Sequence, residues 1–241
     1  MPETFRKPLS PEEAHLQYLR NLFHDLRGPL ASIQKSAEIA AGDLGRTPES
    51  EIRELLVIIK GESERLLEFL TLKLEAEAFD RGTVSLNKSA FEISKFLAAI
   101  AATLQEEFSE KNCRADFYDP GTPLWVEADK IKMARLFQIL GKLLAVRGGA
   151  LALEVKENKG PRSVRIAIRV LDPCPNPPEA DPPSLALQVA RDILKLHGTT
   201  LEPEGPMRGS EFHFSLARLP ESTKTPDPQN LRGAEPDGKK P

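Results

Sequence analysis

Apolar residues recur every three or four positions along the first third of the chain. The steps alternate between three and four, which is the heptad pattern of helices that pack along their length. Residues 42–45 read Gly-Asp-Leu-Gly, which ends a helix between the two series. The pattern predicts two helices of about 30 residues each. The first series is Leu16, Leu19, Phe23, Leu26, Leu30, Ile33, Ala37 and Ala40, and the second is Ile52, Leu56, Ile59, Ser63, Leu66 and Leu70.

The starts of both helices carry the expected signals. Ser10 can cap the first helix and Pro11 fits its first turn, whereas Thr47 can cap the second. A lone pair of helices has no closed core, so it leaves much apolar surface in water. The simplest solution is a homodimer in which two hairpins form a four-helix bundle.

After Gly82 the pattern changes to mixed helices and strands. Alternating apolar and polar residues indicate strands, and wider apolar periods indicate helices. His197 is expected to cap the end of a helix, and His15 and His213 suggest no role. We predict strands at 83–86, 115–118, 124–126, 150–155, 164–171 and 210–216, and helices at 90–108, 129–145 and 184–196.

The predicted domains follow from these changes of pattern. Residues 1–10 form an N-terminal lead, 11–81 the helical hairpin and 82–219 an α/β domain. Residues 220–241 are polar and rich in proline with few apolar anchors, so we expect a disordered tail. The fold class is therefore α + α/β, with a hairpin that dimerises into a four-helix bundle and an α/β sandwich.

Composition narrows the possible partners and location. The net charge of -3 and the pI of about 5.9 give no support to nucleic-acid binding or to a basic membrane surface. No apolar run approaches the roughly 20 residues that span a bilayer, and the first ten residues lack the apolar core of a signal peptide. Cys113 and Cys174 show no metal-ligand spacing and are expected to be small, buried or half-buried residues. A cytoplasmic protein is the expectation.

His24 lies beside the apolar seam of the first helix rather than on it. In the heptad frame Phe23 and Leu30 occupy a positions, so His24 falls at b and faces water. The run from residue 24 to residue 30 reads His-Asp-Leu-Arg-Gly-Pro-Leu. It resembles the phosphoacceptor box of the histidine kinase superfamily, which reads His, Glu or Asp, Leu, Arg, any residue, Pro, Leu. The order of helices and strands across residues 10–218 also resembles that superfamily.

The resemblance implies a role for each residue of this box. His24 would be the phosphoacceptor, since a neutral imidazole is a competent nucleophile at physiological pH. Asp25 would act as a general base or as an acid that orients the ring, or it is an ordinary surface acid. Arg27 would steer an incoming phosphate or an acidic partner. Gly28 lacks the side chain with which Thr or Asn at this position in the family helps to hydrolyse a partner's phosphate.

The same resemblance implies an ATP-binding sandwich in residues 82–219, but several of its parts are replaced. The two Asn positions of the family's metal-binding helix fall on Lys142 and Val146, and Val offers no oxygen to Mg²⁺. Asp172, which would accept a hydrogen bond from the adenine amino group, is present. The alternative is that Asp172 is simply an acidic residue in the turn at the end of a strand. Between Asp172 and Ser184 the chain has six prolines and no glycine. Proline has no N–H with which to cradle phosphates.

Three functions fit these features. In the first, a dimeric phosphorelay protein carries a phosphoryl group on His24 and exchanges it with aspartates of receiver domains; no cofactor is then expected. In the second, a divergent sensor histidine kinase phosphorylates itself on His24 with ATP and Mg²⁺. In the third, a non-catalytic dimer regulates another histidine kinase. The first is favoured because it explains an intact box beside a depleted nucleotide site.

Overall fold

The computed structural model describes residues 11–42, 48–108, 113–145, 150–157, 163–171, 184–204 and 210–220. The chain divides into two compact units, Met1–Glu77 and Ala78–Pro241. The predicted lead at 1–10 and the predicted tail after Pro220 lie outside the described residues, as do Thr47 and Cys174.

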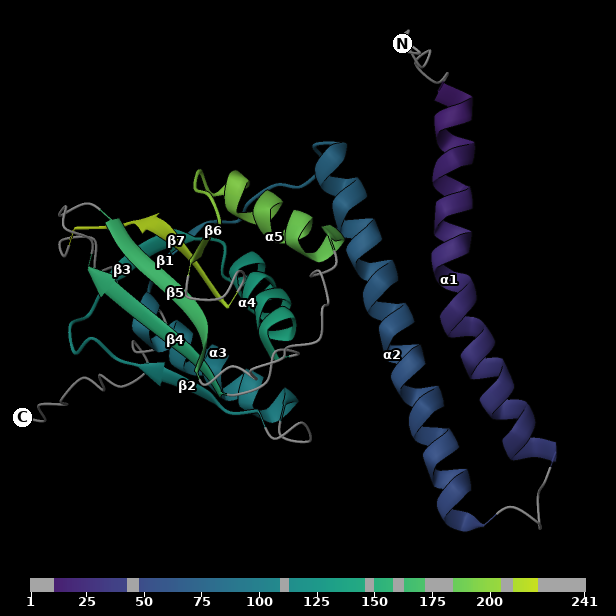
Figure 1. Ribbon diagram of the computed structural model, residues 1–241. Helices are drawn as coiled ribbons and strands as arrows, with labels where there is room; N and C mark the ends of the chain where they lie inside the picture. Colours follow the sequence, from purple (N-terminus) through teal and green to yellow (C-terminus); the bar gives the residue numbers. More distant parts are fainter. Residues whose placement is uncertain are drawn as a thin grey trace, which may run out of the picture. The chain divides into compact units, whose positions relative to one another are not determined.

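The first unit is built from two helices of 32 residues each, α1 (Pro11–Gly42) and α2 (Glu49–Asp80). They run antiparallel and are joined at one end (Figure 1). Both helices were predicted from the heptad spacing, and both are confirmed. At about 1.5 Å per residue each is about 48 Å long.

Only part of the apolar seam is covered within one chain. On α1, Leu26 and Ile33 are half-buried, whereas Phe23 and Leu30 are 67% and 53% exposed. The exposed residues are the a positions of the heptad, and the half-buried residues are the d positions. On α2 a matching row remains exposed, comprising Leu56, Leu67, Leu70 and Leu74. Each helix therefore presents a second apolar row that the hairpin does not cover.

The second unit is an α/β sandwich, and the predicted fold class is confirmed. A two-stranded antiparallel sheet pairs β1 (Ser89–Glu92) with β3 (Trp125–Ala128). A five-stranded sheet has the order β2-β4-β5-β7-β6, in which β2 and β4 are parallel and the other pairs antiparallel. Its strands are β2 (Ala115–Tyr118), β4 (Ala150–Glu157), β5 (Ser163–Leu171), β6 (Glu202–Glu204) and β7 (Glu211–Ala217), and the helices are α3 (Ile93–Glu107), α4 (Lys130–Ala145) and α5 (Ser184–Leu196).

One short strand was predicted at the wrong residues, and another was not predicted. The strand expected at 83–86 lies instead at Ser89–Glu92, because only these residues find backbone partners on β3. The helix expected from residue 90 therefore begins at Ile93. The sequence also gave no sign of β6, whose residues Glu-Pro-Glu have low strand propensity. Pairing with β7 at the edge of the sheet, where a proline can be accommodated, forms this strand.

Alternation along the strands places the core between the sheet and the helices. Inward-facing residues of the central strands, such as Ile166, Ile168 and Phe214, are almost fully buried. They face the helices, of which α4 contacts α3, α5, β4 and β5. Phe137 of α4 lies with its ring centroid 6.0 Å from that of Phe214. The helix α4, which carries Lys142, is thus the central helix of this core.

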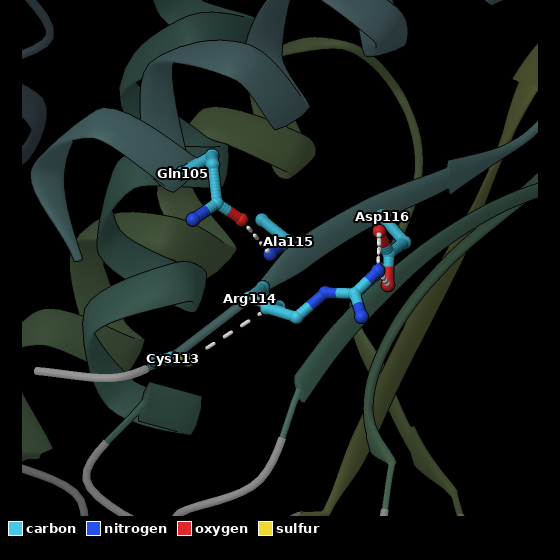
Figure 2. A network of polar contacts seen from close by, with 5 residues as sticks. All are labelled: Gln105, Cys113, Arg114, Ala115 and Asp116. Carbon is cyan, nitrogen blue, oxygen red and sulfur yellow. Dashed lines mark hydrogen bonds and ion pairs between the residues drawn. The ribbon is translucent and has the colours of Figure 1, made fainter. Parts of the chain in front are cut away.

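Polar contacts attach α3 to the edge strand β2 (Figure 2). Oε1 of Gln105 accepts a hydrogen bond from the N–H of Ala115 at 2.9 Å. The Arg114 guanidinium donates to both carboxylate oxygens of Asp116, at 3.1 and 3.3 Å. Cys113, just before the strand, is 4% exposed, so it is the small buried residue that was predicted.

Asp129 starts α4 as its N-terminal cap and is 5% exposed. Its carboxylate accepts hydrogen bonds from the N–H groups of Ile131, Lys132 and Asn87. Burial alone would raise the pKa of Asp129, but the N–H groups of Asn87, Lys132 and Ile131, together with nearby His197, hold it below its ordinary value. The charged form of this carboxyl group therefore stabilises the folded state.

Asp192 on α5 has a pKa that is shifted in the opposite direction. Its burial raises its pKa, and the charge of Asp80 adds to this effect, whereas Lys195 opposes it. Its Oδ2 is buried without a hydrogen-bond partner in the described part of the chain. The charged form of Asp192 therefore destabilises the folded state.

Gly141 gives a test of how closely α3 and α4 pack. A Cβ on Gly141 would lie 2.9 Å from Cδ2 of Leu104, which is fully buried. We expect Gly141→Ala to lower the free energy of unfolding by about 1–3 kcal/mol because Leu104 must move within a filled core. Gly61→Ala in α2 is the matched control, since its Cβ would meet nothing within 4 Å. It should stabilise the helix by up to about 1 kcal/mol.

Denaturant unfolding of both variants measures this difference. If Gly141→Ala proves as stabilising as Gly61→Ala, α3 can move away from α4 without cost, and the close packing inferred here is wrong.

The two aspartates predict opposite effects of pH on stability. The contribution of Asp129 is fully present above the unfolded-state pKa of about 4 and is lost as pH falls through its lower folded-state pKa. For Asp192 the folded state gains stability as pH falls through its raised pKa. We therefore expect Asp129→Asn to lower the free energy of unfolding at pH 7 and Asp192→Asn to raise it. The difference in unfolding free energy between each variant and the parent should shrink well below pH 4. If both variants changed the free energy of unfolding in the same direction at pH 7, the opposite roles assigned to Asp129 and Asp192 would be wrong.

Candidate functional site

His24 is held on the surface of α1 by the heptad spacing of its neighbours. Its side chain is 84% exposed. The preceding residue, Phe23, belongs to the exposed apolar row, and Leu26 lies on the half-buried row. The ring is therefore open to a second macromolecule while its backbone is fixed in a regular helix.

Asp25 lies beside one ring nitrogen of His24. Its Oδ1 is 3.5 Å from Nδ1, and the Asp25 side chain is itself 46% exposed. This separation is longer than an ordinary hydrogen bond but close enough for a charge to act on the ring. A carboxylate on the Nδ1 side favours the tautomer with its proton on Nδ1, which leaves the lone pair of Nε2 available.

Two cationic side chains flank His24 on the same face of α1. Arg20 lies four residues before it and Arg27 three residues after it, and such residues are neighbours on a helix surface. Both are exposed. In the part of the chain that the structure describes, neither guanidinium is recorded in an ion pair. Sequence reasoning selected Arg27 but missed Arg20, although its spacing of four from His24 was the available signal.

α1 continues through Gly28 and Pro29. Proline has no N–H, so the carbonyl of Asp25 loses its usual donor within the helix. A Cβ on Gly28 would meet nothing within 4 Å, so packing does not require glycine there. The open position four residues after His24 therefore has room for a side chain that this chain does not supply.

The α/β unit shows what replaces one part of the expected nucleotide site. Lys142, at the first of the two Asn positions, lies with Nζ 3.2 Å from Oε1 of Glu107 on α3. This cation thus interacts with a carboxylate of its own domain. Val146 and Asp172 lie outside the described residues, so the adenine contact expected for Asp172 stays a prediction.

His197 and His213 have structural contacts. His197 follows α5: its Nδ1 lies 2.8 Å from the carbonyl oxygen of Ile193, and its Nε2 accepts the N–H of Asp129 at 3.1 Å. The predicted capping role is confirmed. His213 lies 2.8 Å from Oε2 of Glu202 on the neighbouring strand.

No helix in the described ranges combines the length and apolar character needed to cross a bilayer. Among the same residues, no three His, Cys, Asp or Glu side chains are grouped so that they could hold a metal ion.

Comparison of the sequence with known proteins gives remote matches. No protein-family model matches the chain. The sensor protein kinase WalK of Staphylococcus aureus is 23% identical over 163 residues, which cover 67% of this chain and 38% of that protein. WalK from the Newman strain is also 23% identical, over 26% of its length. The chain thus spans well under half of the curated relatives it matches.

Solved structures share the fold. Histidine kinase AdeS of Acinetobacter baumannii superimposes with a TM-score of 0.60 at 15% identity, covering 81% of this chain and 96% of that one. Histidine kinase ThkA in complex with response regulator protein TrrA gives 0.58 at 19% identity, covering 85% and 62%. Full-length ShkA in complex with AMPPNP gives 0.57 at 16% identity, covering 84% and 46%. The resemblance inferred from the sequence is confirmed, and the chain is a histidine-kinase-like protein in its fold.

Proposed function

We propose that this chain is a two-component phosphorelay protein that carries a phosphoryl group on His24 and exchanges it with aspartates of receiver domains. The observation that carries the proposal is the position of His24, 84% exposed on a regular helix with Asp25 on its Nδ1 side. An acceptor that must enter a partner's active site has to be exposed in this way, whereas a structural histidine such as His197 is held on both nitrogens.

The transfer step follows from the chemistry of the ring. The Nε2 lone pair of His24 attacks the phosphorus of an aspartyl phosphate, and the bond from phosphorus to the receiver carboxylate breaks. The carboxylate leaves with the electron pair, and the ring keeps its Nδ1 proton and becomes positively charged. Asp25 stabilises this charge and holds the ring orientation. The reverse step delivers the group to a second receiver.

Arg20 and Arg27 support this step electrostatically. A receiver phosphorylated on aspartate brings negative charge to the face of α1 that carries both residues. Exposed cations contribute little to static stability but raise association rates with anionic partners. The role proposed for Arg27 therefore extends to Arg20.

Receiver domains are the partners that the fold comparison favours. ThkA, which shares the fold over 85% of this chain, is described in complex with a response regulator protein. We assign the same class of partner to this chain because it shares the fold and because the sequence around His24 is exposed.

The second candidate function is ATP-dependent autophosphorylation of His24. The matched proteins support it because they are named as kinases. ShkA supports it further because its solved structure is a complex with AMPPNP. The donor set of this chain fits Mg-ATP poorly, because Lys142 is paired with Glu107 and Val146 has no metal-binding oxygen. Asp172 would remain the adenine contact if a nucleotide does bind.

We propose that the chain forms a homodimer because the hairpin leaves two apolar rows uncovered. Phe23 and Leu30 of α1 and Leu56, Leu67 and Leu74 of α2 are each more than half exposed. Two rows of large apolar side chains on one hairpin are unusual for a surface in water, and a second copy would bury both. His24, one residue from the row, would stay at the edge of such a bundle.

A direct test separates the two candidate functions. The full chain is incubated with a receiver domain that has been phosphorylated with acetyl phosphate, and separately with labelled ATP and Mg²⁺. We expect label on His24 from the receiver alone, and none from either donor in His24→Ala. Label from ATP that is lost in His24→Ala would establish the second function, and absence of label from every receiver of the source genome would reject the first.

Asp25 provides a sharper test of the mechanism. Asp25→Asn removes the charge beside Nδ1, so we expect transfer from the phosphorylated receiver to slow by about a hundredfold. Glu38→Gln is the matched control, because Glu38 is an acid on the same helix. Its side chain accepts a hydrogen bond from the Gln34 amide at 2.9 Å. Single-turnover rates measure both variants. If Asp25→Asn and Glu38→Gln transfer equally fast, Asp25 is an ordinary surface acid.

The dimer is tested by placing a charge on the apolar row. Leu67→Glu should weaken association at least tenfold, because burying a leucine contributes about 1.5–3 kcal/mol. Ser50→Glu adds the same charge at an exposed position in the first turn of α2 and should leave association unchanged. Sedimentation over a range of concentrations measures both. A parent chain that is monomeric throughout would refute the dimer.

A further inference from the structure

The carboxylate of Asp129 connects two segments that lie far apart in the sequence. Its Oδ1 accepts the N–H groups of Ile131 and Lys132 in the first turn of α4, at 3.0 and 3.1 Å. Its Oδ2 accepts the N–H of Asn87 at 2.8 Å. Asn87 precedes Asp129 by 42 residues and lies in the stretch between α2 and β1. Because Asp129 is only 5% exposed, water competes poorly for these bonds.

The backbone of Asp129 reaches a third segment. Its N–H donates to Nε2 of His197 at 3.1 Å, and Nδ1 of that ring lies 2.8 Å from the carbonyl oxygen of Ile193. Since Nε2 accepts, Nδ1 carries the ring proton and donates to the carbonyl. Both nitrogens are thus occupied, and the ring ties the last turn of α5 to the residue that starts α4.

The segment that is held in this way follows directly on the end of the hairpin. α2 ends where the N–H groups of Gly82 and Thr83 bond the carbonyls of Phe79 and Ala78, at 2.9 and 3.1 Å. Residues 83–88 have no regular secondary structure, and β1 begins at Ser89. Asn87 is therefore fastened to Asp129 just before the chain enters its first sheet.

We infer that Asp129 is a coupling residue. It ties the stretch after the hairpin to the first turn of α4 through its side chain and to the last turn of α5 through its backbone. A displacement at the end of α2 is passed through Asn87 to both helices of the α/β core. This inference goes beyond the phosphotransfer proposal, because it holds whichever donor phosphorylates His24.

The substitution Asp129→Asn separates the two functions of the side chain. Asparagine caps helices as well as aspartate does, so its one oxygen can serve Ile131 and Lys132. Its NH₂ group then faces the N–H of Asn87, and two donors cannot bond. We expect hydrogen exchange of the Asn87 amide to accelerate about tenfold or more, because this amide loses its hydrogen bond to a charged acceptor. Exchange of the α4 amides should change less.

The matched control is Asp119→Asn. Asp119 also accepts a backbone N–H, that of Gly121 at 3.0 Å, but it does so in an exposed turn of the same unit. This variant should leave exchange at Asn87 and along α4 at parent rates, which separates loss of the Asp129 contact from a general effect of removing one negative charge.

A double-mutant cycle tests the coupling itself. Gly82 has φ +64, so Gly82→Ala strains the end of α2 without touching Asp129. In the parent background we expect Gly82→Ala to accelerate exchange of the Ile131 and Asp129 amides about threefold or more. In the Asp129→Asn background the same change should have little further effect, because the connection is already broken.

The full chain is used throughout, with exchange measured under native conditions and cooperative unfolding checked for each variant. Equal accelerations at Ile131 in both backgrounds would overturn the inference, as would no response to Gly82→Ala in the parent.

Discussion

The alternation of three and four residues between the apolar positions of α1 is the constraint on which the rest of this structure depends. It leaves Leu26 and Ile33 half-buried and Phe23 and Leu30 exposed. It also fixes His24 at the position beside the seam, so that the ring is exposed while the helix stays regular. The same periodicity thus leaves an apolar row uncovered and a histidine side chain exposed beside it.

The α/β unit shares the fold of solved histidine kinase structures. Its central helix α4 contacts α3, α5, β4 and β5, and its inner sheet residues are almost fully buried. Within it, Lys142 interacts with Glu107 of α3. Such a domain can serve as a docking or regulatory body, and Asp129 gives it a defined connection to the stretch that follows α2.

Long periodic elements were predictable from the sequence, and short elements were not. The two hairpin helices, α5 and the paired strands β4 and β5 were located within a few residues, because each repeats its pattern over several turns or alternations. β1 was misplaced and β6 missed, since strands of four and three residues are defined by the partner strand rather than by their own composition. The exposure of His24 followed from the heptad frame, whereas its distance to Asp25 did not.

The contacts of Asp129 were also outside the reach of sequence reasoning, although an aspartate before Lys130 and Ile131 is a recognisable capping signal. Its bond to Asn87 joins residues 42 apart, and no local pattern encodes that distance. His197 was correctly expected to cap α5, but its acceptance of the Asp129 N–H depends on how the two helices pack. Arg20 was missed because the phosphoacceptor-box pattern begins at His24 and does not include the residues before it.

The most direct test of the central claim is the identity of the donor that phosphorylates His24. The full chain is incubated either with a receiver domain phosphorylated on aspartate or with Mg-ATP, and the peptide that contains His24 is examined by mass spectrometry at neutral pH. The account predicts a phosphoryl group on His24 from the receiver and none from Mg-ATP. Phosphorylation from Mg-ATP but from no receiver would contradict it.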